Sequence, residues 1–285
     1  MRVLVEKIEL DSGVEIAYKL SGNPSGVPIV FVHGFAGRGA GYDPLVDRIR
    51  RDFFVLQYDQ RGHGESSKPV GNTYEETRQL YKLTQFADDF RELVDKLEFP
   101  TPFVIYGHSM GGMIAQVFVL RFLKEKLVSH AVFASTLPFY GTENMRGLVA
   151  KFKSGEMVVG EETFRMMDAM GYTTKFRRQH PEIVEEELRW KLLMPPEVYV
   201  AVMENFVEDF DVRDQLQGVD VPTLVITGKR DGLVDSKNSE FIASKVPGAK
   251  LVVIPKTSHA IVRENTDVVE RELRELVGLP TSGLQ

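Results

Sequence analysis

The chain repeats short apolar runs, most of which end in turns rich in glycine and polar residues. The runs at residues 3–10 and 14–20 alternate between apolar and polar positions, and Asp11-Ser12-Gly13 separates them. They predict an antiparallel hairpin, half exposed, at one edge of a sheet. Six later runs also predict strands, at 29–32, 53–58, 103–107, 131–134, 222–227 and 250–254. The run at 29–32 is continuously apolar, which is typical of a strand buried on both faces.

Helical periodicity fills most of the intervals between these strands. Apolar residues recur at three- and four-residue spacing between 83 and 97, which predicts an amphipathic helix. Further helices are predicted at 44–51, directly after 109, at 236–245 and at 267–277. Eight strands that mostly alternate with helices predict an α/β fold, with a mainly parallel sheet covered by helices on both faces.

The alternation stops between residues 138 and 210, where helical patterns follow one another. Glycines and the pair Pro195-Pro196 interrupt these patterns. The insertion falls between the sixth and seventh strands and predicts a helical cap over one end of the sheet. We therefore expect a core made of residues 1–137 and 211–280, a cap at 138–210 and a short tail at 281–285. Seven of the ten methionines and the single tryptophan, Trp190, lie in the cap.

Composition and charge limit the kinds of molecule that this protein is expected to bind. The 285 residues are 43% hydrophobic and 27% charged, which is typical of a globular protein with a substantial core. The net charge of -6 and the absence of a basic cluster argue against nucleic acid. No apolar run approaches the roughly 18 residues that span a bilayer, and the N-terminus lacks a secretory pattern. With no cysteine the chain can form no disulfide, which indicates a cytoplasmic protein. We expect it to act on a small molecule, as a monomer or homodimer.

The strand at 103–107 leads into Gly107-His108-Ser109-Met110-Gly111, and a helical pattern begins at once. This is the G-x-S-x-G pattern of a nucleophile elbow, in the strand–turn–helix setting that gives it meaning. The sharp turn is expected to hold Ser109 in strained backbone geometry with its hydroxyl exposed above the sheet. Gly107 and Gly111 are expected because a Cβ at either position would collide with a neighbouring strand or helix.

A serine hydroxyl needs a base to remove its proton, and a histidine held by a carboxylate is the usual solution. Six histidines are present. Three occupy tight glycine-flanked loops, including His108, whose side chain is expected to point away from the hydroxyl of its neighbour. His130 opens a strand and His180 lies in the cap. His259, directly after the last strand, is therefore the predicted base.

Asp231 is the predicted acid, because it follows the seventh strand at its carboxyl end. The alternative reading of Asp231 is an Asp-Gly turn former. A second carboxylate, Asp235, lies at a helix start where a helix N-cap is the simpler explanation. The chain order Ser109, Asp231, His259 favours the catalytic reading, because it is the order found in α/β-hydrolases.

With these motifs in view, the sequence resembles the α/β-hydrolase superfamily over nearly its whole length, and in particular its capped carboxylesterases, lactonases and cofactor-free haloperoxidases. The matching residues are His33-Gly34-Phe35, residues 59–66, residues 107–112, Asp231 and His259. The resemblance implies an α/β-hydrolase fold and an oxyanion hole formed by the backbone amides of Phe35 and Met110. It implies no cofactor. The loop at 59–66 is expected to be structural, since its acidic and histidine residues lack the spacing of a metal site.

The resemblance also implies a reaction class. A serine at the elbow excludes the branches that use aspartate there, and the His-Gly-Phe loop lacks the Gly-Gly-Pro-Gly run of proline iminopeptidases. We expect a serine carboxylic ester hydrolase for small to medium apolar esters, working through an acyl-enzyme. Lactone hydrolysis, acyl transfer or perhydrolysis by the same triad are alternatives, and a slow-turnover ligand receptor is another. His33, Gly34 and the cap aromatics Phe139 and Trp190 are predicted to contact the substrate.

Overall fold

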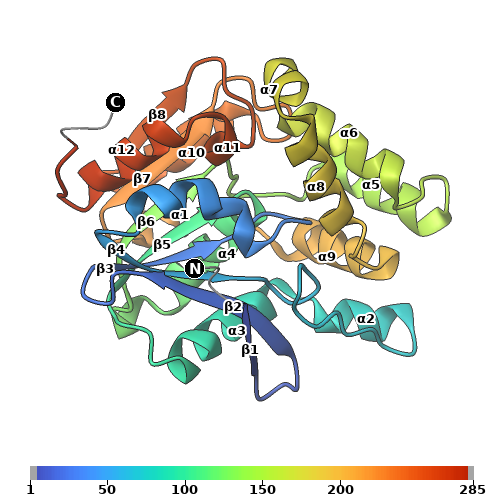
Figure 1. Ribbon diagram of the computed structural model, residues 1–285. Coiled ribbons are helices and arrows are strands. Elements are labelled where there is room, and N and C mark those ends of the chain that lie inside the picture. Colours follow the sequence, from blue (N-terminus) through green and yellow to red (C-terminus); the bar gives the residue numbers. More distant parts are fainter. Residues whose placement is uncertain (1–4, 282–285) are drawn as a thin grey trace.

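Eight strands form a single sheet in the computed structural model, which describes residues 5–281 (Figure 1). Residues 1–4 of the predicted core and residues 282–285 of the predicted tail lie outside the described residues. The strands are β1 Glu6–Glu9, β2 Glu15–Gly22, β3 Val27–Val32, β4 Phe53–Tyr58, β5 Phe103–His108, β6 Val128–Ala134, β7 Thr223–Gly228 and β8 Lys250–Ile254.

The strand order across the sheet is β1-β2-β4-β3-β5-β6-β7-β8. The hairpin of β1 and β2 is antiparallel and forms one edge, and β2 also pairs antiparallel with β4. All five remaining pairings are parallel. The prediction of a mainly parallel sheet with an antiparallel hairpin at its edge is confirmed. Because the parallel strands share a direction, the loops that follow β3, β5, β7 and β8 emerge at one end of the sheet.

Helices cover both faces of the sheet and form a separate group beside it. The α-helices are α1 Asp43–Ile49, α2 Tyr74–Leu80, α3 Leu83–Lys96, α4 Met110–Arg121, α5 Glu143–Ser154, α6 Glu161–Gly171, α7 Thr174–Gln179, α8 Pro181–Lys191, α9 Pro196–Asp209, α10 Ser236–Lys245, α11 Ile261–Glu264 and α12 Thr266–Leu276.

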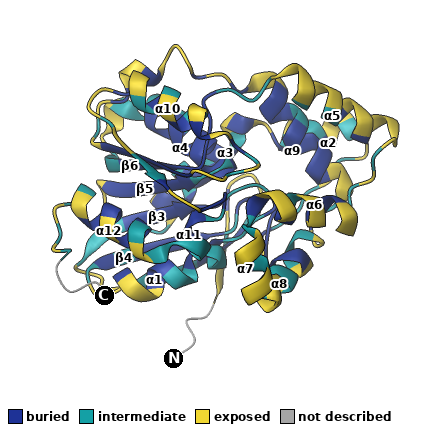
Figure 2. Cartoon of the chain, turned by 90° about the horizontal axis from the view of Figure 1, so that it is seen from above, coloured by how far each residue is buried: buried dark blue, intermediate teal, exposed yellow. Residues whose placement is uncertain are grey.

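Two apolar layers hold the sheet between its helices (Figure 2). Apolar residues of α1, α11 and α12 pack on one face, and residues of α3, α4 and α10 pack on the other. The apolar side of the amphipathic helix α3 is its buried face. Its residue Phe90 is fully buried, and the ring lies 4.4 Å from that of Phe118 on α4. The sheet between the layers fixes the strand ends that carry the site.

Helices α5 to α9 form the insertion between β6 and β7, as predicted, and lie together at one side of the sheet (Figure 1). The sequence interruptions mark their limits. Gly155, with φ of 78°, caps the end of α5, Gly160 precedes α6, and Pro196 is the first residue of α9. Phe139 and Asp211 form a short antiparallel bridge where the chain leaves and re-enters the core. The bridge thus joins the start of the insertion to the segment that follows it.

The short helix α2 is absent from the prediction, although the sequence carries its signal. Thr73 precedes α2, and its hydroxyl oxygen accepts a hydrogen bond of 3.2 Å from the amide of Glu76. The spacing Thr-x-x-Glu is the capping box that marks helix starts. A search for capping residues, in addition to apolar periodicity, would have located this helix.

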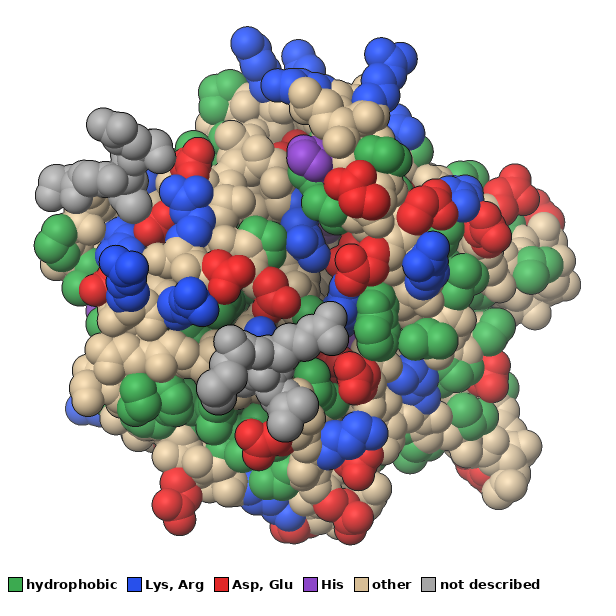
Figure 3. Space-filling view, in the orientation of Figure 1, with side chains coloured by type: hydrophobic (Ala, Val, Ile, Leu, Met, Phe, Trp, Pro, Cys, Tyr) green, Lys and Arg blue, Asp and Glu red, His purple; other side chains and the backbone are tan. Residues whose placement is uncertain are grey.

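The surface carries mixed charge. On the face seen in Figure 3, acidic and basic side chains are interspersed over most of the area. Within residues 5–281, no helix is both long enough and apolar enough to cross a membrane.

A buried ion pair fixes the loop that follows β4. The guanidinium of Arg61 binds the carboxylate of Asp89 on α3 with two nitrogens, and both side chains are almost fully buried. Arg61 also donates a hydrogen bond of 2.9 Å to the carbonyl of Leu80. The loop at 59–66, which supports the segment after β3, is thereby tied to the helical layer.

We predict that Asp89→Ala lowers the free energy of unfolding by about 3–5 kcal/mol, because it leaves the Arg61 charge buried and uncompensated. Urea denaturation monitored by circular dichroism measures the change. Asp88→Ala is the matched control, because Asp88 pairs with Arg121 at the surface and should cost under about 1 kcal/mol. Equal effects of the two substitutions would contradict this role for Arg61 and Asp89.

Candidate active site

Ser109 lies at the turn between β5 and α4 in a backbone conformation that few residues adopt. Its φ and ψ are 54° and -120°, so the turn is strained, as predicted. Three further contacts hold it. The amide of Ser109 donates to the carbonyl of Ala134, its carbonyl accepts from the Thr136 hydroxyl at 2.7 Å, and the amide of Gly112 donates to the same carbonyl. The surrounding hydrogen bonds therefore enforce the strained conformation.

The glycines of the elbow are required by close packing. A Cβ on Gly107 would lie 2.4 Å from the carbonyl oxygen of Gly111 and 2.7 Å from Cβ of Ala115, both in α4. A Cβ on Gly111 would lie 2.0 Å from the carbonyl oxygen of Val32, at the end of β3. The predicted collisions with the helix and with the strand are both present.

The base and the acid predicted for Ser109 are in direct contact. Nδ1 of His259 lies 2.7 Å from Oδ2 of Asp231. Because a carboxylate only accepts, Nδ1 carries the proton and Nε2 is left as the basic atom. The other oxygen of Asp231 accepts from the amides of Leu233 and Val234, at 2.9 and 2.8 Å. Asp231 is thus a turn former and the partner of His259 at once, so the two readings of this residue are compatible.

Asp235, the other carboxylate considered for the acid, has a different task. Its side chain accepts a hydrogen bond of 2.9 Å from the amide of Lys237 and caps the start of α10. The simpler explanation for this residue is correct.

Ser109 and His259 line the same cavity. Within residues 5–281, no hydrogen bond joins the Ser109 hydroxyl to the His259 ring. Catalytic hydrogen bonds are often long in the free enzyme and shorten when substrate binds, so lining a common cavity is the relevant observation.

The loop after β3 presents one peptide group in a fixed orientation. The carbonyl oxygen of Gly34 accepts from Nδ1 of His33 at 2.8 Å and from the amide of Gly37 at 3.0 Å. In a planar trans peptide the N–H points opposite to the C=O, so the amide of Phe35 points to the other side of the loop. A Cβ on Gly34 would lie 3.1 Å from Cβ of Ser109, which shows how closely this loop approaches the elbow.

Both ring nitrogens of His33 form hydrogen bonds that hold this loop. Its Nε2 accepts from the amide of Gln60 at 3.0 Å, while its Nδ1 donates to Gly34, so one neutral tautomer satisfies both bonds. Burial lowers the pKa of His33 and keeps the ring neutral. His33 and Gly34 line the cavity as predicted, but both ring nitrogens of His33 are occupied, so its polar contacts serve the loop and not a ligand.

Met110 is the first residue of α4, so its amide has no acceptor within the helix and lies at the positive end of the helix dipole. Phe35 and Met110 both line a cavity together with Ser109. The two residues whose amides are predicted for the oxyanion hole thus line one cavity with Ser109.

The His108 side chain has a role that was not predicted. Its ring lies 4.6 Å from the ring of His259 and lines the same cavity. Its Nε2 donates to the carbonyl of His259 at 2.9 Å, and burial lowers its pKa to about 3. His108 is thus a neutral support for the segment that carries His259, and position in the elbow alone did not reveal this.

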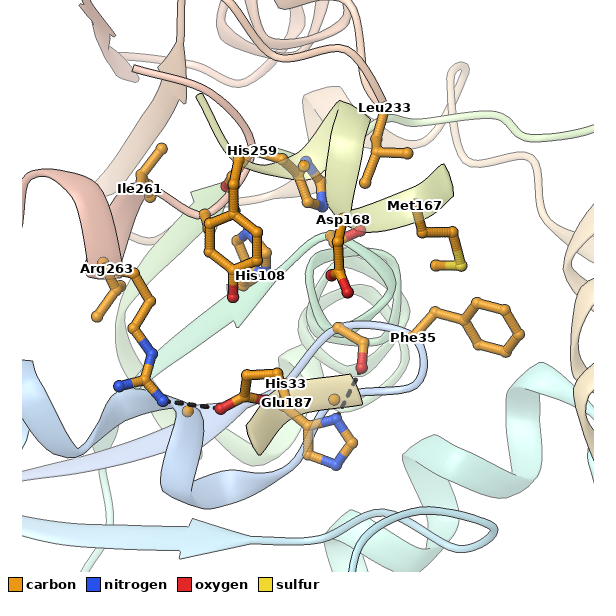
Figure 4. A pocket seen from close by; sticks show the side chains of 18 of the residues that line it. His33, Phe35, His108, Met167, Asp168, Glu187, Leu233, His259, Ile261 and Arg263 are labelled. Atoms are coloured by element: carbon orange, nitrogen blue, oxygen red, sulfur yellow. Dashed lines mark hydrogen bonds and ion pairs between the residues drawn. The ribbon is translucent and has the colours of Figure 1, made fainter. Parts of the chain in front are cut away.

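Two cavities meet at Ser109. The first, of about 170 Å³, also contacts His259 and contains the charged side chains of the site (Figure 4). The second, of about 100 Å³, lies on the side of α4 and is apolar. Apart from Ser109, its lining comprises Phe35, Met110, Met113, Tyr140, Met167, Val202, Met203, Phe206, Leu233 and Val234. Met167 and Met203 come from the methionine-rich cap.

Neither Phe139 nor Trp190 is among the residues that line these two cavities. The ring of Phe139 packs under the guanidinium of Arg213, at 4.1 Å. The guanidinium of Arg38 lies over the Trp190 ring, 4.6 Å from its centroid. Each ring contacts an arginine and lies outside these two cavities, so a contact of Phe139 or Trp190 with substrate stays a prediction.

Charged residues of the cap were missed by sequence reasoning. Glu187 of α8 binds Arg263 of α11 at 2.9 Å, and Lys191 binds Asp168 of α6. All four line the first cavity (Figure 4). The sequence shows which residues of the cap helices are charged. It does not show which face of each helix turns toward the core.

Comparisons with known proteins agree with this architecture. The sequence model of a family described as "Serine aminopeptidase, S33" matches residues 23–266. A proline iminopeptidase from Pestalotiopsis fici is 26% identical over 95% of this chain and 98% of its own length. A non-heme haloperoxidase from Rhodococcus erythropolis is 29% identical over 95% and 98%.

Solved structures share the same fold. An esterase from Thermogutta terrifontis superposes with a TM-score of 0.83, at 24% identity, over 96% of this chain and 98% of that one. Together with the eight-stranded sheet and its helical insertion, these matches confirm the predicted α/β-hydrolase fold. The chain belongs to the serine aminopeptidase S33 family of the α/β-hydrolase superfamily.

Proposed function

We propose that this hydrolase is a serine carboxylic ester hydrolase that acts on small to medium apolar esters. The observation that carries the proposal is the position of Ser109, where a strained turn, a His259–Asp231 pair and two cavities meet. An apolar cavity suits an acyl chain, while the family's aminopeptidase description would require a site for a peptide amine.

In the proposed mechanism, Asp231 holds the His259 tautomer that leaves Nε2 basic. His259 removes the proton of Ser109 as its oxygen attacks the ester carbonyl. The amides of Phe35 and Met110 would stabilise the negative oxygen of the tetrahedral intermediate. His259 then gives its proton to the leaving alcohol, and a water activated by the same histidine releases the acid from the acyl-enzyme.

This proton transfer indicates which part of the ester each cavity holds. The leaving oxygen must lie within reach of His259, which lines the first cavity and not the second. The alcohol portion therefore occupies the first cavity and the acyl chain the second. The second cavity, at about 100 Å³, is well below the roughly 300–1,000 Å³ of ligand pockets in general. We therefore infer a short acyl chain.

A panel of p-nitrophenyl esters with increasing acyl chain length, run beside several lactones, tests this function. We expect kcat/KM to peak at short chains and to fall once the chain exceeds the apolar cavity. Ser109→Ala should abolish hydrolysis of every ester, since members of a triad act as a unit. An organophosphate should label Ser109, and labelling at another residue would overturn the assignment of the nucleophile.

Asp231→Asn should lower kcat about 10³- to 10⁴-fold, because the amide no longer fixes the His259 tautomer. Asp235→Asn is the matched control. Asparagine also caps helices well, so this change should leave both kcat and the melting temperature nearly unaltered. A comparable loss of kcat in the two variants would remove Asp231 from the triad.

His33→Phe should lower kcat by about 10- to 100-fold with a smaller change in KM, because the Phe35 amide loses its fixed orientation. The loss should be less than the 10²–10³ that follows removal of an oxyanion donor, since the amide itself remains. Steady-state kinetics with p-nitrophenyl butyrate provide both constants. His180→Phe, in a half-exposed part of the cap, is the control, and an unchanged kcat in His33→Phe would refute the role of the loop.

A further inference from the structure

Asp168 is a buried carboxylate with an unused hydrogen-bonding oxygen. It lies on α6 of the cap, is 5% exposed and lines the first cavity. Its Oδ1 is bound by the ammonium of Lys191. Its Oδ2 is shielded from solvent and has no hydrogen-bond partner among the described residues. In Figure 4 the side chain points from α6 into the space beside His108 and Met167.

A buried oxygen of this kind is rarely left without a donor, since more than about nine in ten buried polar groups are paired. The site described above does not use it. Nothing in the triad or in the oxyanion loop is hydrogen bonded to Asp168, and its contact with Lys191 occupies only the other oxygen. A donor supplied by a bound molecule would complete the arrangement.

The surrounding charges indicate what kind of donor fits. Lys191 already neutralises Asp168. Arg263 pairs with Glu187, and Arg38 pairs with Glu186 at 2.6 Å and with Glu187 at 3.5 Å. The three cations are thus matched by three carboxylates. An ammonium group beside Asp168 would lie close to Lys191 and add unbalanced positive charge, whereas an uncharged hydroxyl group would not.

The place of Asp168 in the site identifies the part of the substrate concerned. Asp168 lines the first cavity together with His259 and does not line the apolar cavity. Under the proposed function, on which this inference rests, the first cavity holds the alcohol portion of the ester. We propose that Asp168 accepts a hydrogen bond from a second hydroxyl group on that alcohol. The preferred substrates are then short-chain monoesters of diols or other polyhydric alcohols.

Three butyrate esters that differ only at the end of the alcohol test this specificity. Propyl butyrate lacks a polar group there, 3-methoxypropyl butyrate offers only an acceptor, and 3-hydroxypropyl butyrate offers a donor. We expect kcat/KM for the hydroxypropyl ester to exceed both others by about tenfold, because a site built around a hydrogen bond discriminates against analogues that lack it. Titration of the released butyric acid measures all three rates.

The substitution Asp168→Asn tests directly whether Asp168 accepts this hydrogen bond. Because Lys191 can only donate, the new amide should turn its oxygen toward Lys191 and its NH₂ group toward the cavity. The preference for hydroxypropyl over methoxypropyl should then disappear, while the methoxypropyl ester should gain relative to the propyl ester. Glu162→Gln, at an exposed position of the same helix, is the control and should keep the wild-type order. Circular dichroism and thermal melting verify that both variants are folded.

The possible outcomes separate this inference from the proposed function. Hydrolysis of all three esters at equal kcat/KM by the wild-type enzyme would overturn the role of Asp168 and leave the esterase proposal intact. A hydroxypropyl preference that persists in folded Asp168→Asn would also overturn it. If no ester is hydrolysed and an organophosphate does not label Ser109, both proposals fail. Loss of the preference in Asp168→Asn alone supports the assignment.

Discussion

The close approach of α4 to the ends of β3 and β5 is the constraint on which the site depends. The backbone of α4 comes so near that a single carbon atom on Gly107 or Gly111 would overlap a carbonyl oxygen. A chain that leaves β5 and must enter a helix at this distance has to turn within one residue. Ser109 is that residue, and its positive φ is the geometric result. Such strain costs on the order of 1–3 kcal/mol, which the packing of two apolar layers must outweigh.

Strained geometry persists only where neighbours enforce it, and here they also build the rest of the site. Thr136, from the segment after β6, binds the carbonyl of Ser109. The segment after β3 is fixed by His33, which is itself fixed by Gln60 from the loop after β4. That loop is anchored to α3 through Arg61. Segments that are distant in sequence therefore support the turn at Ser109. They can do so because they follow parallel strands, whose carboxyl ends lie at the same end of the sheet.

Much of this could be predicted because it depends on local patterns. Strand and helix periodicity predicted the sheet and the insertion, and the elbow motif predicted the strained serine. His259 and Asp231 followed from their positions after strands, and the structure brings the two side chains together. What could not be predicted depends on how separate elements face one another. The contact of His108 with His259, and the inward orientation of Asp168, arise only when helices are placed on the sheet. The packing of Phe139 and Trp190 against arginines is of the same kind, since aromatic content does not say which way a ring points.

The cap also supports the site, because the end of α6 is hydrogen bonded to the loops that carry the proposed acid and base. The carbonyl of Met170 accepts from the amide of Gly232 at 3.3 Å and from the hydroxyl of Ser258 at 2.9 Å. The carbonyl of Gly171 accepts from the amide of Ala260 at 3.1 Å. These donors are the immediate neighbours of Asp231 and His259 in the chain.

The same helix contributes Met167 to both cavities and Asp168 to the first. A shift of α6 would therefore move the walls of the substrate site and the supports of the His259–Asp231 pair together. Because unpaired carbonyls at a helix end are costly to bury, the three contacts at residues 170 and 171 resist such a shift. Under the proposed function, the residues that select a substrate and those that position the base share one rigid element, so changes in the cap are expected to affect both properties at once.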